Sequence, residues 1–273
     1  MGTNTVVKSL VAASAFALVA GTSQAAVISF SATYGSHTDG VAQAAEASFL
    51  SSLHSSYITE DFNDLAALEA GASGDLIGET LGTTDKTRWL MAASSFDTKV
   101  GTFSMTAPAP NPGSNNNIEE DKLMIEGMAS DGDVTGEYGR FVNWDGGNWL
   151  DSNDADKITW DISTGSPFNA LGFYLSDAND QGAQLKLNFA DGTSTEYLQI
   201  MPNLADKNLA YVSLTSSQTI TSASLVFNNG VGNNDGFGID RVTVGRVPEP
   251  GTMALLALGI AGLGAARRRQ KAA

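Results

Sequence analysis

The stretch "KITWDISTGSPFNALGFYLSDANDQGAQLKLNFADGTSTEYLQI", residues 157–200, decides the fold. It opens on Ile158, Trp160 and Ile162, which alternate with polar residues and so give a strand one apolar face. The runs "ALGFYLS" and "QLKLNF" alternate in the same way, and the "DG" pair after the second run is typical of a two-residue hairpin turn. Short alternating runs separated by turns predict antiparallel strands rather than strand–helix–strand units.

The same pattern continues on both sides of this stretch. Near the start "VISFSATY" alternates, and near the end "LAYVSL", "ITSASLVF" and "GFGIDRVTVG" follow one another. We therefore predict a mainly β protein, an antiparallel β-sandwich of the jelly-roll kind. One amphipathic helix near the N-terminus is predicted within residues 39–57, with Asp39 as its N-cap. Its apolar stripe would consist of Val41, Ala45, Phe49, Leu53 and Tyr57.

The last of these runs changes phase in its middle. Phe237 and Ile239 share one face of the strand, whereas Val242 and Val244 fall on the other. The switch, at "DR", predicts either a β-bulge at this point or a strand that is buried on both sides.

The N-terminus has the three parts of a secretory signal peptide. Lys8 precedes an apolar run over residues 10–21, and the small residues "TSQAA" come next. This order predicts a signal peptide over residues 1–25, which signal peptidase cuts between Ala25 and Ala26. The alternative is a buried N-terminal helix. With a signal peptide, the protein is exported.

Composition limits the partners of the exported part. The 273 residues carry a net charge of −15, and without the two ends ten basic residues face 30 acidic ones, about −20 over residues 26–250. Such a surface repels nucleic acid and favours divalent cations such as Ca²⁺. The chain has no cysteine, which excludes disulfides and thiolate zinc sites, and its two histidines are too few for a three-histidine site.

Catalytic motifs do not stand out, and we predict no catalytic residue and no enzyme. The sequence has no Gly-x-Ser-x-Gly elbow, no His-Glu-x-x-His and no phosphate-binding glycine loop. A secreted hydrolase remains a third alternative, because a glycosidase needs only two carboxylates across a cleft and the chain has 30 acidic residues.

A Ca²⁺ site is the one cofactor that the sequence suggests. The run "DANDQG", residues 177–182, places oxygen-bearing side chains at alternate positions before a glycine, like the first half of a calcium loop. The twelfth position is Asn188 rather than an acid, so the run is not an EF-hand. The alternative is a solvated turn. The candidate ligands are Asp177, Asn179, Asp180, Asp235 and Asp240.

Two tryptophans are candidates for ligand contact. In "FVNWDGGNWLDS", residues 141–152, a four-residue hairpin loop would place Trp144 and Trp149 opposite each other. Paired indoles can stack on a sugar ring. The alternative is a cross-strand aromatic pair that stabilises the hairpin.

The C-terminus, "VPEPGTMALLALGIAGLGAARRRQKAA", combines a short motif, an apolar run and a basic cluster. The apolar run over residues 251–266 has 16 residues, roughly 24 Å as a helix against about 30 Å of hydrocarbon. It predicts a short C-terminal hydrophobic helix. Arg267, Arg268 and Arg269 would stop it at the cytoplasmic side by the positive-inside rule.

This ending resembles the PEP-CTERM sorting signal of Gram-negative bacteria that make exopolysaccharide. The resemblance implies that an exosortase recognises Val247, Pro248, Glu249 and Pro250 and removes the tail. It also implies an inner-membrane intermediate, then a location at the cell surface or outside the cell.

These observations divide the chain into a signal peptide (1–25), a β-sandwich ectodomain (26–246) and a sorting signal (247–273). We expect an exosortase-processed protein with a structural or adhesive role in the exopolysaccharide or biofilm matrix. The alternative is a carbohydrate-binding module, with or without dependence on Ca²⁺, for which polysaccharide is the partner.

Overall fold

The described part of the chain comes from a computed structural model and covers most of the predicted ectodomain. It comprises residues 28–54, 56–65, 89–107, 122–127, 142, 147–152, 155, 157–177, 184–189, 193–195, 198–199, 208–220, 223–228, 236–248 and 259. The predicted signal peptide with its cleavage site, and the predicted apolar helix apart from Gly259, lie outside the described residues. Among the residues that are described, no helix is long and apolar enough to cross a membrane.

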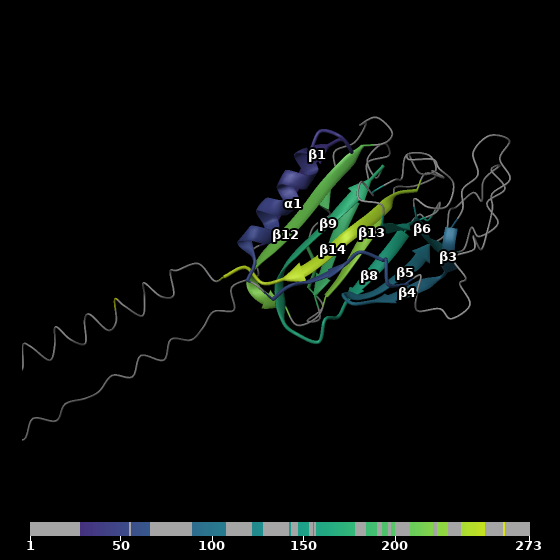
Figure 1. The fold of residues 1–273 in the computed structure, drawn as a ribbon. Coiled ribbons are helices and arrows are strands. Elements are labelled where there is room, and N and C mark those ends of the chain that lie inside the picture. Colours follow the sequence, from purple (N-terminus) through teal and green to yellow (C-terminus); the bar gives the residue numbers. More distant parts are fainter. Residues whose placement is uncertain are drawn as a thin grey trace, which may run out of the picture.

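The strands form two antiparallel sheets that pack as a sandwich (Figure 1). The larger has eight strands in the order β1-β12-β9-β14-β7-β6-β3, with β2 paired to β14. Its strands are β1 (Ile28–Gly35), β2 (Ile58–Glu60), β3 (Trp89–Ala93), β6 (Leu123–Gly127), β7 (Asn148–Asp151), β9 (Phe168–Ser176), β12 (Leu209–Ile220) and β14 (Gly238–Gly245).

The smaller sheet has six strands in the order β11-β10-β13-β8-β5-β4. Its strands are β4 (Ser95–Thr98), β5 (Gly101–Ala107), β8 (Lys157–Ile162), β10 (Gln184–Phe189), β11 (Leu198–Gln199) and β13 (Ala223–Asn228). The predicted fold class, a mainly antiparallel β-sandwich with one N-terminal helix, is confirmed.

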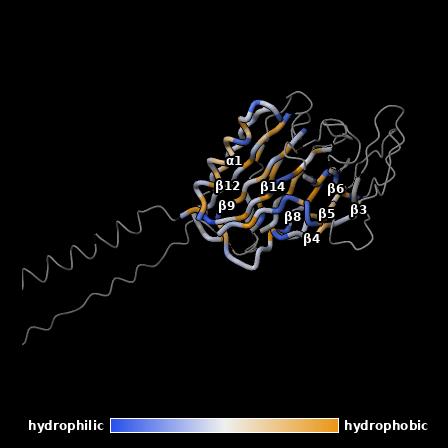
Figure 2. The backbone as a smooth tube through the Cα atoms, viewed as in Figure 1, coloured by the Kyte–Doolittle hydropathy of each residue, from blue (hydrophilic) through white to orange (hydrophobic). Residues whose placement is uncertain are grey.

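Aromatic side chains fill the space between the sheets. The rings of Phe103 and Trp160 stack at 5.3 Å, and Trp160 meets the edge of Phe173 at 6.4 Å. Phe227 continues the column at 5.4 Å from Phe173. Each such pair adds about 0.5–1.5 kcal/mol beyond the burial of its area. Figure 2 shows hydrophobic and hydrophilic segments alternating along the strands, as the period of two requires.

The helix α1 (Val41–Ser52) covers the outer face of the larger sheet over β1, β12 and β9. All nine residues of β9 are therefore buried, because one face meets the other sheet and the other face meets the helix. A Cβ at Gly172, in the middle of β9, would lie 2.6 Å from the Phe49 ring of α1. Glycine at this position lets the helix approach the sheet closely.

The predicted helix is confirmed, but its predicted apolar stripe is partly wrong. The buried residues of α1 are Ala42, Glu46 and Phe49, whereas Val41 is 42% exposed. Tyr57 lies beyond the end of the helix and is 40% exposed. The stripe drifts because 3.6 residues per turn does not keep a strict spacing of four on one face.

The N-cap of α1 is Gly40, in the left-handed region with φ 74°, rather than Asp39. Asp39 contributes from one position earlier, since its Oδ1 accepts a hydrogen bond from the amide of Val41 at 2.9 Å. This bond lowers the pKa of the Asp39 carboxyl below its usual value.

The sequence left two alternatives for the phase change in β14, and the structure shows both: a β-bulge, in a strand that is buried on both faces. The register between β14 and β9 shifts between Asp240 and Thr243, and Arg241 has φ 48°. Ile239 before the bulge and Val242 after it both belong to the core between the sheets. The extra residue therefore returns the apolar side chains to the same face.

We expect Gly101→Ala to lower the free energy of unfolding by about 3 kcal/mol or more, measured by chemical denaturation. Gly101 has φ 124°, and a Cβ there would overlap the carbonyl oxygen of Asp161 and lie 2.7 Å from the Ser163 amide. Gly165→Ala is the matched control, with φ 68° and nothing within 4 Å, and it should cost about 1–2 kcal/mol. Equal costs would contradict the close approach of β5 and β8.

Candidate functional site

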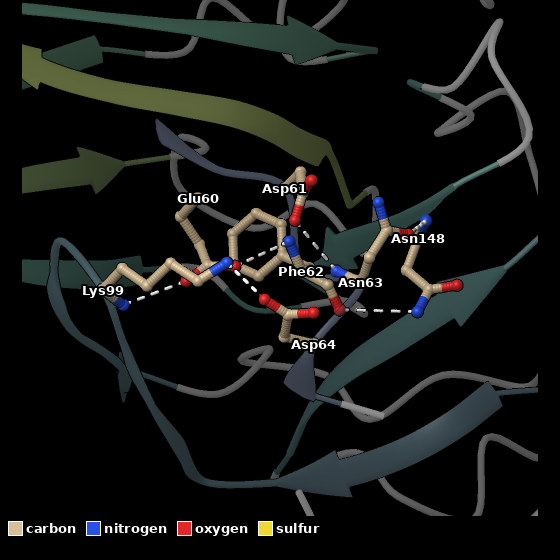
Figure 3. Close-up of polar contacts among 7 residues, drawn as sticks. All are labelled: Glu60, Asp61, Phe62, Asn63, Asp64, Lys99 and Asn148. Atoms are coloured by element: carbon tan, nitrogen blue, oxygen red, sulfur yellow. Dashed lines mark hydrogen bonds and ion pairs between the residues drawn. The ribbon is translucent and has the colours of Figure 1, made fainter. Parts of the chain in front are cut away.

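A turn that follows β2 gathers polar side chains from both sheets (Figure 3). Glu60 is 1% exposed and accepts two backbone hydrogen bonds, from Phe62 at 2.8 Å and from Lys99 at 2.9 Å. Lys99 belongs to the turn between β4 and β5, so this carboxylate joins the larger sheet to the smaller one. We call Glu60, the segment 61–64, Lys99 and Asn148 the inter-sheet turn.

Phe62 holds the centre of the inter-sheet turn. It has φ 56°, unusual for a bulky residue, and its side chain is fully buried with its ring 5.8 Å from Phe103. The backbone amide of Asn148, on β7, donates a hydrogen bond to Asn63 Oδ1 at 2.8 Å. This bond holds the turn against β7. The Glu60 bonds and the aromatic contact hold a backbone conformation that costs about 1–3 kcal/mol.

Charge at this turn lies on its exposed side. Lys99 Nζ and Asp64 Oδ2 are 2.5 Å apart, and this hydrogen bond raises the pKa of the lysine. Both side chains are largely exposed, at 45% and 67%, so the pair contributes little to stability. Chemically, both Glu60 oxygens are occupied by backbone amides, which suits a structural acceptor rather than a general base.

A second buried carboxylate, Glu46, lies between α1 and the larger sheet. Its Oε2 accepts a hydrogen bond from the Tyr174 hydroxyl at 2.8 Å, and its Oε1 accepts one from Arg241 Nε at 2.7 Å. Tyr174 lies on β9, and the bulge of β14 presents Arg241 to the helix. Glu46 therefore ties α1 to two strands.

Two tyrosines stand together beside Glu46. The rings of Tyr174 and Tyr211 meet edge to face at 4.9 Å. Burial raises the pKa of both tyrosines well above the usual value, and the charge of Glu46 raises it further. The hydroxyl of Tyr211 is buried and has no hydrogen-bond partner in the part of the chain that is described.

Sequence reasoning missed both buried carboxylates. Glu46 is four residues after Ala42 and three before Phe49, so helical spacing alone places it on their face. Glu60 carries no comparable signal, because β2 has three residues and its pairing with β14 spans most of the chain.

The predicted Ca²⁺ ligands are described only in part. Asn179, Asp180 and Asp235 lie outside the described residues. Asp177 and Asp240 are buried, at 2% and 3% exposure. Asp240 pairs with Tyr174 in the β9 register, three positions from Asp177, which is roughly 10 Å along a strand. Within the described ranges, no three His, Cys, Asp or Glu side chains are placed to hold a metal. Calcium stays a prediction.

The predicted tryptophan pair is also described only in part, since Trp144 lies outside the described residues. Trp149 is 2% exposed and belongs to an apolar cluster under α1 that includes Phe49 and Tyr174. An indole buried in this way has no open face on which a sugar ring could stack.

The sandwich ends at the predicted sorting motif. Asn169 of β9, 7% exposed, holds Val247 through two hydrogen bonds: its Oδ1 accepts from the Val247 amide at 2.7 Å, and its Nδ2 donates to the Val247 carbonyl at 3.2 Å. The amide of His54 donates to the Arg246 carbonyl at 2.8 Å. The ordered contacts of the fold therefore reach the first residue of "VPEP".

The described residues form two packed antiparallel sheets that lead directly into this motif. The model of the PEP-CTERM protein-sorting motif matches residues 246–269, so the chain carries this sorting motif. The motif indicates an exosortase-targeted exported protein that is anchored in the membrane transiently before release. No curated relative matches the sequence.

Solved structures with similar folds include carbohydrate-binding modules. A mutant of the family 29 module CBM29-2 gives a TM-score of 0.29 at 11% identity and covers 72% of this chain and 97% of its own. Another family 29 module gives 0.26 at 10% identity, covering 82% and 94%. The Agl-KA catalytic domain gives 0.25 at 12%, covering 37% and 22%. TM-scores this low carry no argument about function.

We expect Glu60→Gln to lower the free energy of unfolding by about 1.5–3 kcal/mol, because an amide offers one acceptor oxygen where two buried amides need one each. Asp61→Asn removes the same charge from the same turn but keeps an oxygen for the Asn63 amide, 3.3 Å away in the native turn. Its cost should stay within about 0.5 kcal/mol. Urea unfolding of both variants measures the two losses in the free energy of unfolding. A smaller loss for Glu60→Gln than for Asp61→Asn would contradict the inter-sheet role of Glu60.

The two tyrosines form a matched pair for a second experiment. Tyr174→Phe loses a hydrogen bond to a charged carboxylate and should cost about 1.5–3 kcal/mol. Tyr211→Phe removes a buried hydroxyl that has no partner among the described residues, so its stability should be unchanged or higher. Thermal or urea unfolding at pH 7 compares them.

The same variants should also differ from the native protein in how their stability depends on pH above 10. The folded protein holds the two hydroxyl protons more tightly than the unfolded chain, so their contribution to stability is complete below the ordinary tyrosine pKa of about 10. It is lost as the pH rises above that value. Each Phe variant should therefore lose stability less steeply above pH 10 than the native protein. An equal slope in all three proteins would contradict the assignment.

Proposed function

We propose that this protein is a non-catalytic structural or adhesive component of an exopolysaccharide or biofilm matrix. Signal peptidase would remove residues 1–25. The apolar segment 251–266, stopped by Arg267, Arg268 and Arg269, would then anchor the chain in the inner membrane until an exosortase cuts the tail. The protein would afterwards reside at the cell surface or outside the cell.

The observation that carries this proposal is the junction between fold and motif. The PEP-CTERM match begins at residue 246, and Asn169 holds Val247 against the sandwich through its two hydrogen bonds. A compact body attached directly to a sorting tail suits a protein whose whole folded part is the delivered product.

The use of the buried carboxylates supports a non-catalytic role. Glu46 joins α1 to β9 and β14, and Glu60 joins the two sheets through backbone amides. A carboxylate whose oxygens are already committed to folded elements is poorly suited to move protons during catalysis.

One observation favours the alternative, a carbohydrate-binding module. Whereas α1 covers the larger sheet, the outer face of the smaller sheet carries polar side chains that are exposed or half-buried. Strand register places Ser104, Thr159 and Lys186 in one row across it, interrupted by Val226. The next row holds Asp97, Thr102, Asp161, Ser224 and Asn188. Side chains spaced about 4.8 Å apart across strands could hydrogen-bond to sugar hydroxyls, with or without Ca²⁺.

The two functions are tested in one strain. A deletion strain should make less matrix material, measured as extracellular biomass, and the native gene should restore it. Glu249→Ala should leave the protein in the membrane fraction with its tail uncut. An amount of matrix that the deletion leaves unchanged, although the native protein is found in the matrix, would contradict the structural role.

The binding alternative uses the same strain and isolated polysaccharide. Thr159→Lys places a bulky charge on the polar sheet face, and Ser31→Lys does the same on an exposed position of β1. If the sheet binds sugar, Thr159→Lys should weaken pull-down roughly tenfold, the effect of one or two lost hydrogen bonds, and Ser31→Lys should not. Equal binding by both variants would contradict the sheet-face site.

A further inference from the structure

Both ends of the described sandwich leave the larger sheet on the same side. Strand register aligns Ser29, Thr215, Ala170 and Gly245 in one row across β1, β12, β9 and β14. The start of β1 and the end of β14 are therefore three strand spacings apart, about 14 Å. Figure 1 shows the yellow end of β14 leaving the sandwich beside α1. We call this side the terminal end of the sandwich.

At the terminal end, contacts with the sandwich hold the chain as far as Val247. Val247 is held by Asn169, and it packs against the buried apolar cluster that includes Phe49, as do Leu50 and Leu53. The Arg246 carbonyl is held by the amide of His54, just after the helix. The residue held in this way, Val247, is immediately before Pro248.

The distance to the membrane follows from chain length. Four residue steps separate Val247 from Gly251, where the apolar segment begins, and a fully extended chain spans at most about 3.6 Å per step, roughly 14 Å in all. The polar headgroup layer of one leaflet is about 5–8 Å thick. While segment 251–266 is in the bilayer, the terminal end must therefore lie at or next to the headgroups.

The side chains exposed at the terminal end suit that position. Three large hydrophobic residues of the described chain are exposed, and two of them, Tyr57 at 40% and Ile58 at 36%, lie here. Ile58 pairs with Val244, and a Cβ at Gly245 would lie 3.0 Å from Tyr57 Cβ. Exposed Arg246 adds a cation in a chain of net charge −15.

We propose that Tyr57, Ile58 and Arg246 form a surface that docks on the polar interface of the bilayer while the tail is uncut. Tyrosine is favoured at the headgroup level, where its ring is apolar and its hydroxyl stays hydrated. Docking orients the sandwich so that the terminal end contacts the membrane and the start of α1 faces away from it. This inference rests on the anchoring by residues 251–266 proposed above.

The absence of cysteine allows single labels on the full chain. Ser56→Cys places a fluorophore at the terminal end and Thr38→Cys places one near the start of α1, roughly 18 Å further along the 12-residue helix. The labelled chains are reconstituted in phosphatidylcholine vesicles that contain a headgroup-nitroxide lipid. Quenching should be several-fold stronger at position 56 than at position 38.

A matched substitution tests the docking surface itself. Tyr57→Ser with Ile58→Thr should lower quenching at position 56 toward that at position 38. Val41→Ser removes a comparably exposed side chain, 42%, at the other end of α1 and should leave quenching unchanged. Unfolding midpoints of all variants identify any loss of fold.

Flotation of the vesicles separates the two proposals. Equal quenching at positions 38 and 56 in chains that float with the vesicles overturns the docking and leaves the anchoring intact. Quenching that is indifferent to Tyr57→Ser with Ile58→Thr overturns the role of the two side chains. Chains that stay at the bottom of the flotation gradient are not bound to the vesicles. This result overturns both the anchoring and the docking.

Discussion

The arrangement of the sandwich depends on β14 being packed on both faces. Its inner face meets the aromatic core between the sheets, and on its outer face Arg241 reaches Glu46 of α1. One strand can serve both only because the bulge at Asp240 and Arg241 changes phase without losing the pairing to β9. Without the extra residue, Val242 and Val244 would face the helix and Arg241 the core.

Two buried carboxylates complete this packing with directional bonds. Apolar burial is strong but does not select one position for a helix on a sheet or for one sheet on another. Glu46 gives α1 a fixed place over β9 and β14, and Glu60 fixes the β4–β5 turn against β2. Burying charge in this way is costly, and both groups meet the cost through hydrogen bonds to each oxygen.

The sorting motif gives the fold its cellular context. Because Val247 is part of the packed body, the geometry of the sandwich and the position of the tail are not independent. The row of residues from Ser29 across to Gly245 sets the side from which both ends of the described sandwich depart. The proposed orientation at the membrane therefore follows from the sheet register, whereas the polar face of the smaller sheet is on the side of the sandwich not covered by α1.

Local patterns in the sequence were enough to predict the fold class, the phase change in the last strand and the sorting signal. A period of two, a phase change at "DR" and the order of motif, apolar run and arginines need no knowledge of distant contacts. Local patterns do not decide the metal ligands or the tryptophan pair, since acidic turns and paired indoles each allow a structural alternative.

Tertiary structure alone decided what these patterns do. Trp149 is buried in the cluster that includes Phe49 of α1. Glu60 and Lys99 are 39 positions apart, Asn169 and Val247 are 78 apart, and Glu46 and Tyr174 are 128 apart. Partners this far apart in sequence are brought together by strand register, which no local pattern encodes. Local sequence patterns therefore indicate which elements form, whereas the pairing of those elements determines which side chains meet.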